Sequence, residues 1–333
     1  MSSIHPQNEE IANAPTLSIV IPCYDEELVL PETLSRLRTL LDDLAEEGAI
    51  AAESTLLFVD DGSKDDTYRF LSEAATEDCR VEVLKLSRNF GHQNALFAGL
   101  AHSRADFTLS MDADLQDDPA VIRDMLVAAK EGAKVVYGVR RRRDKDRLIK
   151  RVPARLYYRI LRLVGIEIIE DHADFRLLHR DALNALLQFD EVHLFLRGMV
   201  PLIGFPSRIV HYDRAERFAG ETKYSPRKML RLALDGITSF SAAPLHLIAW
   251  LGVLVSLSAI GLAIWALIIR LLGHAIPGWA SIVVPLYFIG GIQLLSLGVI
   301  GIYLSKIYAE SKKRPRYIVE AFTRAESSCR EQR

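Results

Sequence analysis

The sequence predicts an α/β protein, with a mostly parallel, doubly wound sheet that carries helices on both faces, followed by a membrane-associated C-terminal part. Two observations predict the sheet: short apolar runs alternate with helical patterns through the first half of the chain, and the connections between them are short. A third observation predicts the membrane part, because two long stretches after residue 244, separated by Arg270, contain no Asp, Glu, Lys or Arg.

Composition argues against several classes of protein. The net charge is −2 over 333 residues, so it gives no electrostatic argument for nucleic-acid binding. Three cysteines, Cys23, Cys79 and Cys329, are far apart and odd in number, which fits a reducing compartment rather than a disulfide framework or a zinc site. Residues 1–16 are polar, so we expect a disordered N-terminus and no cleavable signal peptide.

Strands and helices are expected to alternate up to residue 138. The strands are expected at 17–22, 55–59, 81–86, 107–111 and 134–138, and the helices at 31–44, 65–75, 92–103 and 119–131. Pro22 ends the first strand, and Pro31 suits the first turn of the first helix. Asp65 or Asp66 is expected to cap the second helix.

The stretch from Phe107 to Pro119, FTLSMDADLQDDP, carries the strongest chemical signal. Its apolar run reads as a buried strand that delivers Asp112, Asp114 and Gln116 to the loop beyond it. Ligands of open α/β sheets bind outside the carboxyl ends of the strands. Magnesium takes one or two protein carboxylates and fills its other positions with water and substrate phosphates. The stretch therefore predicts a metal–diphosphate site, with a plain solvated acidic loop as the alternative.

Two further features suit the two ends of a nucleotide. Asp60 and Asp61 follow a strand, where a carboxylate can accept hydrogen bonds from a ribose or a uracil N–H, or can simply cap a helix. Eight of the twelve residues from Arg140 to Arg151 are basic. Nucleic-acid binding and a solvated face are the usual interpretations of such a run. We favour phosphate recognition, with Arg140 as the best single candidate.

The middle region is less regular. A helix is expected at 152–164, a polar–apolar break at 172–178, a helix at 180–188 and a strand at 207–212. Asp174 lies in the break, as a functional carboxylate or as the salt-bridge partner of Arg176. Beyond the last strand, Arg217, Thr222 and Lys223 form a cationic loop that suits a cluster of anionic oxygens.

The C-terminal part is expected to associate with a membrane. Residues 226–243 have the profile of an amphipathic helix in the interfacial plane, and the stretches 245–269 and 281–305 are long enough to span a bilayer. A basic tail, 306–333, follows the second span. By the positive-inside rule, both termini and the domain at 17–225 face the cytoplasm, which predicts a multi-pass protein of the inner (plasma) membrane.

Six motifs together resemble one family. They are Pro22-x-Tyr24-x-Glu26, Asp60-Asp61-Gly62-Ser63, Asn89-Phe90-Gly91-His92-Gln93, Asp112-Ala113-Asp114-Leu115-Gln116-Asp117, Asp174-Phe175-Arg176-Leu177 and Arg217-Phe218-Ala219-Gly220-x-x-Lys223-Tyr224. The chain resembles the family 2 glycosyltransferases that act on polyprenyl phosphates, a group that contains dolichyl-phosphate mannose synthases. The paired C-terminal helices are most similar to those of the bacterial undecaprenyl-phosphate glucosyltransferase branch. That branch typically has Ser where this chain has Thr222, a change that keeps the hydroxyl.

The resemblance implies a Rossmann-like fold called GT-A and a set of site residues. By resemblance, the nucleotide sugar would be held by Pro22, Tyr24, Glu26, Asp60, Asp61, Asp112 and Ala113. The residues Asp112, Asp114 and Gln116 would bind Mg²⁺ or Mn²⁺ at the diphosphate. Phosphates of donor and acceptor would face Arg140, Arg217 and Lys223, and Asp174 would act as a base or orient the acceptor.

The reaction implied is inverting transfer of a sugar from a nucleotide diphosphate sugar to a polyprenyl phosphate such as undecaprenyl phosphate, with the lipid bilayer as a partner. UDP-glucose is the favoured donor, while UDP-N-acetylglucosamine, other UDP-sugars and GDP-mannose stay open. A processive synthase is disfavoured, because none of Trp250, Trp265 and Trp279 completes the Gln-x-x-Arg-Trp motif. A catalytically inactive, membrane-tethered sensor or scaffold is the non-enzymatic alternative. A homo-oligomer built on small residues such as Gly290 and Gly291 is also open.

Overall fold

The computed structural model describes residues 14–141, 172–192, 194–213, 243–272 and 278–324. The chain divides into two compact units. One unit contains the sheet and its helices, and also the C-terminal residues from Pro315 onward. The other contains two long helices. The predicted features outside the described residues include the helix at 152–164, the loop with Arg217, Thr222 and Lys223, and all but the last residue of the amphipathic helix at 226–243.

The described residues form an eight-stranded mixed sheet, in the order β7-β5-β6-β4-β1-β2-β3-β8. The strands are β1 (Leu17–Cys23), β2 (Thr55–Asp60), β3 (Val81–Leu86), β4 (Phe107–Ser110), β5 (Val135–Arg140), β6 (His172–His179), β7 (Ser207–Tyr212) and β8 (Val319–Thr323). Four pairs are parallel, namely β1–β2, β1–β4, β2–β3 and β5–β7. The pairs β3–β8, β4–β6 and β5–β6 are antiparallel. The mostly parallel sheet expected from the sequence is confirmed.

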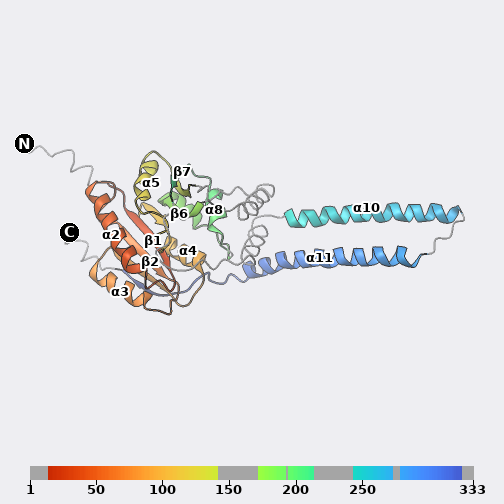
Figure 1. The fold of residues 1–333 in the computed structure, drawn as a ribbon, viewed down its shortest axis with the longest axis horizontal. Coiled ribbons are helices and arrows are strands. Elements are labelled where there is room, and N and C mark those ends of the chain that lie inside the picture. The colour runs from red at the N-terminus through yellow and green to blue at the C-terminus, as the bar shows by residue number, and fades with distance from the viewer. Residues whose placement is uncertain (1–13, 142–171, 193, 214–242, 273–277, 325–333) are drawn as a thin grey trace, which may run out of the picture. The chain divides into compact units, whose positions relative to one another are not determined.

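Helices cover both faces of this sheet, as predicted. They are α2 (Leu30–Glu46), α3 (Thr67–Glu77), α4 (His92–His102), α5 (Val121–Lys130), α7 (Arg180–Leu186) and α8 (Leu196–Leu202). The apolar faces of α2, α3 and α5 share one core with Ile19, Ile21 and Phe58. On the other face α4 packs so closely that a Cβ on Gly99 would lie 2.3 Å from a methyl carbon of Val20. Figure 1 shows α2 and α4 on opposite sides of β1 and β2.

The sequence prediction for residues 172–178 was wrong, because this segment is strand β6 rather than a break. It pairs with β4 and β5 in the middle of the sheet. The charges of Asp174 and Arg176 had argued against a buried strand, but both side chains are buried and form an ion pair with each other. Mutual neutralisation lets a charged sequence occupy the interior.

The last strand, β8, was not predicted at all. It adds antiparallel to β3 and completes one edge of the sheet. Lys85 pairs with Glu320 at 2.8 Å, and Arg324 pairs with the buried Glu82 at 2.7 Å. An exposed strand edge is a template for aggregation, and β8 covers this one. The segment that follows the second long helix is therefore part of the unit that contains the sheet.

Deleting residues 315–333 is expected to destabilise the sheet unit. The deletion uncovers the hydrogen-bonding edge of β3 and removes the arginine partner of Glu82, a buried acid. The matched control deletes only residues 325–333, which keeps β8 and Arg324. Thermal unfolding and size-exclusion chromatography in detergent measure the effect: the longer deletion should melt several degrees lower and aggregate. Equal melting temperatures for the two deletions would contradict this role of β8.

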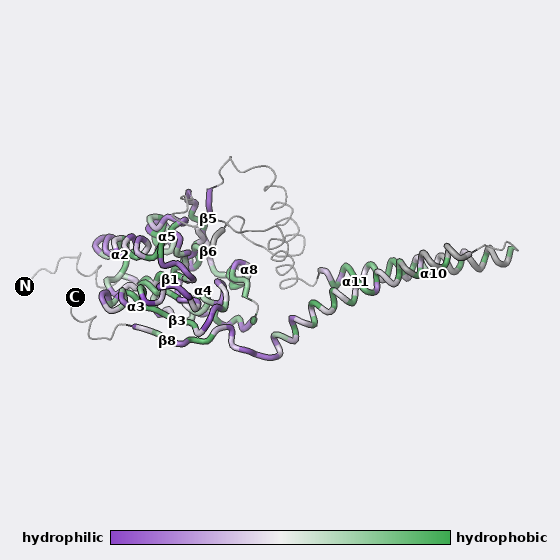
Figure 2. The backbone as a smooth tube through the Cα atoms, turned by 60° about the horizontal axis from the view of Figure 1, so that its bottom comes forward, coloured by the Kyte–Doolittle hydropathy of each residue, from purple (hydrophilic) through white to green (hydrophobic). Residues whose placement is uncertain are grey.

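The second unit contains α10 (Ala243–Leu271) and α11 (Trp279–Ser311), which run side by side (Figure 1). By length and composition, both helices are long and apolar enough to cross a membrane. Figure 2 shows that their coloured parts are mostly hydrophobic. Large apolar side chains such as Trp250, Leu257, Leu286 and Leu294 are more than half exposed in the isolated chain. Both helices extend beyond the predicted spans, 245–269 and 281–305.

Candidate active site

The polar residues singled out in the sequence gather at one edge of the sheet. The parallel strands β1, β2 and β4 end there, so Asp60 closes β2 and Asp112 follows β4 by two residues. Strand β6 runs the other way and therefore begins at this edge. Because Ser110 pairs with Arg176, Asp174, near the start of β6, lies beside the loop that follows β4. One row of side chains thus runs from β2 across β1 and β4 to β6.

Asp60 is a fully buried acid with one unsatisfied carboxylate oxygen. Its side chain is fully buried, and Oδ1 accepts the Ser63 N–H at 3.2 Å. Oδ2 has no hydrogen-bond partner among the described residues. Burial raises the pKa of this carboxyl above its usual range, with partial opposition from the hydrogen bonds of Ser63. An unsatisfied buried acceptor of this kind suits a donor from a ribose or a base.

Asp61 has a structural task instead. Its two oxygens accept the backbone N–H groups of Phe90 and Gly91, at 2.7 and 2.9 Å. The carboxylate thus holds the loop between β3 and α4, and burial raises its pKa. The nucleotide-binding role of Asp61 stays a prediction, because each carboxylate oxygen can accept more than one hydrogen bond. By holding Gly91, Asp61 also positions His92, the residue that follows Gly91.

The neighbouring Gly62 permits a close approach of two loops. It has a φ of +70°, and a Cβ at this position would lie 2.5–2.7 Å from backbone atoms of Arg88 and Asn89. The loop after β1 joins the same arrangement. The Asp25 N–H donates to Ser63 Oγ at 3.1 Å, and the Glu26 N–H donates to Thr67 Oγ1 at 2.9 Å. Of the predicted nucleotide-binding residues on β1 and this loop, Pro22 is buried and Tyr24 is exposed.

Replacing Gly62 by Ala is expected to destabilise the protein and weaken nucleotide binding. The left-handed conformation alone costs an L-residue about 1–2 kcal/mol, and the clash with the backbone at Arg88 adds to this. Gly132→Ala is the matched control, because Gly132 has a φ of +99° with no atom within 4 Å of the added Cβ. Melting temperature and UDP binding by calorimetry measure both. Equal losses in the two variants would show that the loop contact is unimportant.

The acidic loop after β4 is firmly held. Thr33 Oγ1 on α2 donates to the Ala113 carbonyl at 2.8 Å, and the Gln116 N–H donates to Asp114 Oδ1 at 3.2 Å. Leu115 has a φ of +53°, a strained conformation of the kind that clusters at functional sites. The side chains of Asp112 and Asp114 are half-buried, whereas those of Ala113 and Gln116 are buried. Ala113 can therefore reach a ligand only through its backbone.

A metal at this loop would have two protein carboxylates. Within the described ranges, no group of three or more His, Cys, Asp and Glu side chains is arranged to hold a metal ion. Magnesium in phosphate-transfer sites needs only one or two carboxylates, because water and phosphates complete the shell. Asp112 and Asp114, two residues apart on a half-buried loop, fit this donor set. Burial raises the pKa of Asp112, and the neighbouring acids Asp174, Asp117 and Asp114 add to that shift.

Arg140 is tied to a residue that the sequence analysis did not assign. Its guanidinium donates to Asp117 Oδ1 at 2.9 Å and to the Tyr212 hydroxyl at 3.2 Å. The Tyr212 hydroxyl in turn donates to Asp117, which is buried. Burial and the Asp117 charge both raise the pKa of Tyr212. This cluster braces the acidic loop against the ends of β5 and β7, and it leaves Arg140 partly exposed.

Asp174 is the most heavily engaged carboxylate of the site. Its side chain is only 5% exposed and pairs with the fully buried Arg176. His92 Nε2 lies 3.3 Å and Gln93 Nε2 lies 3.1 Å from its Oδ2, and Arg197 approaches both oxygens at 3.4 Å. Burial alone would raise the pKa of Asp174, but the His92 hydrogen bond and the two guanidinium groups hold it well below its usual range. A carboxylate so stabilised as the anion is a poor general base.

His92 bridges two acids. Its Nε2 lies 3.6 Å from Asp112 Oδ1 as well as 3.3 Å from Asp174 Oδ2. Burial opposes the charged form of the imidazole, but the hydrogen bond to Asp174 and the charge of Asp112 outweigh burial and raise the pKa of His92. The site is thus one connected network from the acidic loop to β6.

Comparison with known proteins identifies the family. The profile of Glycosyl transferase family 2 matches residues 18–187. This chain belongs to glycosyl transferase family 2. The uncharacterized glycosyltransferase YkoT of Bacillus subtilis (strain 168) is 50% identical over 309 residues, which cover 92% of this chain and 91% of that protein. The prophage bactoprenol glucosyl transferase homolog of Escherichia coli (strain K12) is 36% identical over 306 residues, which cover 91% of this chain and 98% of that protein.

Among solved structures, glucosyl-3-phosphoglycerate synthase from Mycobacterium tuberculosis, crystallised with Mn²⁺ and UDP-glucose, has a TM-score of 0.44 and 19% identity to this glycosyltransferase. The match covers 72% of this chain and 83% of that chain.

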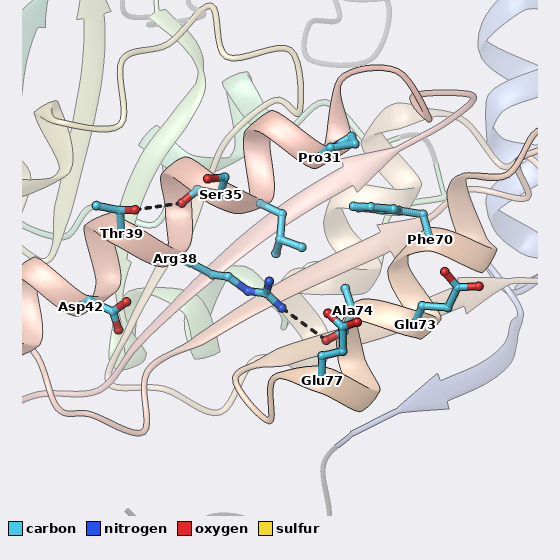
Figure 3. A pocket seen from close by; sticks show the side chains of 10 residues that line it. Pro31, Ser35, Arg38, Thr39, Asp42, Phe70, Glu73, Ala74 and Glu77 are labelled. Carbon is cyan, nitrogen blue, oxygen red and sulfur yellow. Dashed lines mark hydrogen bonds between the residues drawn. The ribbon is translucent and has the colours of Figure 1, made fainter.

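A separate groove on the glycosyltransferase lies away from this network (Figure 3). It has a volume of about 390 Å³ and lies between helices α2 and α3. The residues that line it are Pro31, Leu34, Ser35, Arg38, Thr39, Asp42, Phe70, Glu73, Ala74 and Glu77. Arg38 donates to the Ala74 carbonyl at 3.5 Å. Three acids against one arginine would repel a diphosphate, so this groove does not suit the sugar donor.

Sequence reasoning missed several residues of the glycosyltransferase site. Asp117, Tyr212, His92, Gln93 and Arg197 were given no role. His92 and Gln93 stand in the Asn89–Gln93 motif, and Asp117 closes the acidic motif, so a sequence signal existed for these three. Arg197 and Tyr212 have none. The pairing of β7 with β5 brings Tyr212 to the site, and the hydrogen bonds of Leu196 with Gln93 and Arg176 place Arg197 there.

Proposed function

We propose that this glycosyltransferase transfers glucose from UDP-glucose to a polyprenyl phosphate, with inversion at the anomeric carbon. The single observation that carries the proposal is the row of carboxylates along one end of the strands. The row runs from Asp60, which has an unsatisfied oxygen, through Asp112 and Asp114 to Asp174. The similarity to the bactoprenol glucosyl transferase homolog of Escherichia coli supports both the sugar and the lipid acceptor. N-Acetylglucosamine and mannose are the alternative sugars.

The donor would lie along the row with its nucleoside at β2. Asp60 Oδ2 would accept a hydrogen bond from the nucleoside, next to Tyr24 and Glu26 on the loop after β1. Asp112, Asp114 and Gln116 would hold a divalent cation, Mg²⁺ or Mn²⁺, at the diphosphate. When bound, the cation would stabilise the negative charge that develops on the departing nucleoside diphosphate. Arg140, braced by Asp117, would face the same phosphates.

The acceptor chemistry needs little proton transfer. A phosphate monoester has a second pKa of about 6, so its oxygen is largely ionised near neutral pH. The low pKa of Asp174 fits this requirement, because no base has to remove a proton from the nucleophile. The phosphate oxygen forms a bond to the anomeric carbon as the bond to the diphosphate oxygen breaks. Arg217 and Lys223, which lie outside the described residues, are proposed to neutralise the approaching phosphate.

Two apolar helices favour an enzyme that meets a lipid substrate at the membrane. We assign the domain at 17–225 and both termini to the cytoplasmic side of the inner membrane, because basic residues follow the second helix. The glycine-containing faces of α11 would allow helices of two copies to approach closely.

Transfer of radiolabelled sugar from a panel of nucleotide sugars to undecaprenyl phosphate tests the proposal, in detergent with Mg²⁺, Mn²⁺ or EDTA. We expect a lipid-linked product from UDP-glucose that disappears with EDTA. A product from another donor would correct the sugar but keep the reaction. Nucleotide-sugar binding without transfer to lipid from any donor would overturn the transferase and favour a sensor or scaffold.

A further inference from the structure

We propose that His92 and Arg197 form the binding pair for the acceptor phosphate, held in place by Asp174 as a positioning residue. The inference rests on the proposed function and names a second cationic element of the acceptor site, distinct from the loop with Arg217 and Lys223.

The order of the strands places this pair at the acceptor end of the site. Asp60 belongs to β2, the acidic loop follows β4, and Asp174 lies near the start of β6. Three strand spacings of about 4.8 Å, or roughly 14 Å, separate β2 from β6. A donor whose nucleoside is at β2 and whose diphosphate is at the loop after β4 directs its sugar towards β6. The nucleophile must approach the anomeric carbon from that side.

His92 and Arg197 are the exposed partners of a buried acid. Asp174 is 5% exposed, whereas the side chains of His92 and Arg197 that contact it are 45% and 44% exposed. Arg176 is 1% exposed and neutralises the carboxylate from the interior. Arg176 and Arg197 both contact this one buried carboxylate, Arg176 from the interior and Arg197 from the surface. Asp112, 3.6 Å from His92, is the opposing acid, and in the donor complex it would serve the cation and the nucleotide.

The spacing of the pair is built into the fold. Gln93 donates from Nε2 to Asp174 at 3.1 Å and accepts the Leu196 N–H on Oε1 at 3.2 Å. Arg176 Nη1 donates to the Leu196 carbonyl at 3.2 Å. Both backbone groups of Leu196, the residue before Arg197, are thereby fixed relative to the start of α4, which carries His92. A guanidinium beside an imidazole, both pre-positioned, offers several donors to the oxygens of one phosphate monoester.

Kinetics of Arg197→Ala and His92→Ala in the full-length protein test the proposal. Each variant is expected to raise KM for undecaprenyl phosphate by roughly 10- to 100-fold, the loss of a hydrogen bond to a charged group. KM for UDP-glucose should stay within about two-fold of wild type, and Arg197→Lys should recover part of the loss. The control is Arg123→Ala on helix α5. It removes a similarly exposed arginine that pairs with Glu47.

A binding measurement gives a readout without turnover. In detergent with UDP and Mg²⁺, calorimetry compares farnesyl phosphate, farnesol and inorganic phosphate. Wild type should bind farnesyl phosphate, and Arg197→Ala should bind it at least about ten-fold more weakly. Weak binding of inorganic phosphate that the variant also loses would support the same phosphate site, while farnesol should not respond to the substitution.

The outcomes separate this proposal from the proposed function. A raised KM for UDP-glucose with an unchanged KM for the lipid would assign the pair to the donor and overturn the inference. A lowered melting temperature with proportional loss of both substrates would show a merely structural role and also overturn it. If wild type transfers no sugar to lipid, the proposed function fails, and farnesyl phosphate binding then decides the inference on its own.

Discussion

Asp114→Asn is expected to lower sugar transfer by about 10²–10³-fold, equivalent to roughly 3–4 kcal/mol of barrier. The substitution keeps the shape of the side chain and the hydrogen bond from the Gln116 N–H. It removes one of the two carboxylates that we assign to a divalent cation. The remaining Asp112 shares its charge with His92, 3.6 Å away. Charge on the departing diphosphate would then be poorly stabilised.

Initial rates at saturating donor, over a range of Mg²⁺ and Mn²⁺ concentrations, measure this effect. Asp124→Asn on the exposed face of α5 is the control for the charge change and should leave the rate unchanged. Half-maximal activation of Asp114→Asn should need more metal than wild type. A variant that keeps wild-type activity in the presence of EDTA would sink the metal assignment. Full loss of activity with a lowered melting temperature would point to folding rather than to the metal.

Asp174→Ala is expected to lower stability by about 3–5 kcal/mol, because it leaves Arg176 buried without its partner. For a domain of this size, the loss corresponds to a fall of roughly 10 °C in melting temperature. The Arg176 guanidinium would keep its hydrogen bond to the Leu196 carbonyl, while its Nε has no partner among the described residues. Thermal unfolding of the full protein, followed by far-UV circular dichroism, measures the change in melting temperature.

The double variant Asp174→Ala/Arg176→Met separates charge from packing. Replacing a buried ion pair by apolar side chains of similar volume is often close to neutral. We therefore expect the double variant to recover most of the lost melting temperature while remaining inactive, since His92 and Arg197 would lose their anchor. If the double variant melts no higher than Asp174→Ala, the unpaired charge is not the cause of the loss.

Local pattern alone determined much of this protein. The strands predicted at 17–22, 55–59, 81–86 and 207–212 lie within one residue of their predicted ends. The first two are fully buried, as expected for continuous apolar runs in the middle of a sheet. The two uncharged stretches are long helices for the same kind of reason, since a span must lack charge over its whole length. The predicted ends of β2 and β4 also indicated that the acidic residues after them lie at the same end of the sheet.

Only the tertiary structure decided what the charged residues do. Strand β6 looked like a break because Asp174 and Arg176 are charged, and only their mutual pairing makes burial affordable. Strand β8 joins β3 across more than 230 residues, a contact that no local pattern encodes. In the same way Asp60 and Asp61 are adjacent and chemically identical. Asp61 holds the loop between β3 and α4, whereas Asp60 Oδ2 has no hydrogen-bond partner among the described residues. The partners of a polar side chain depend on distant segments, and those are set by strand order.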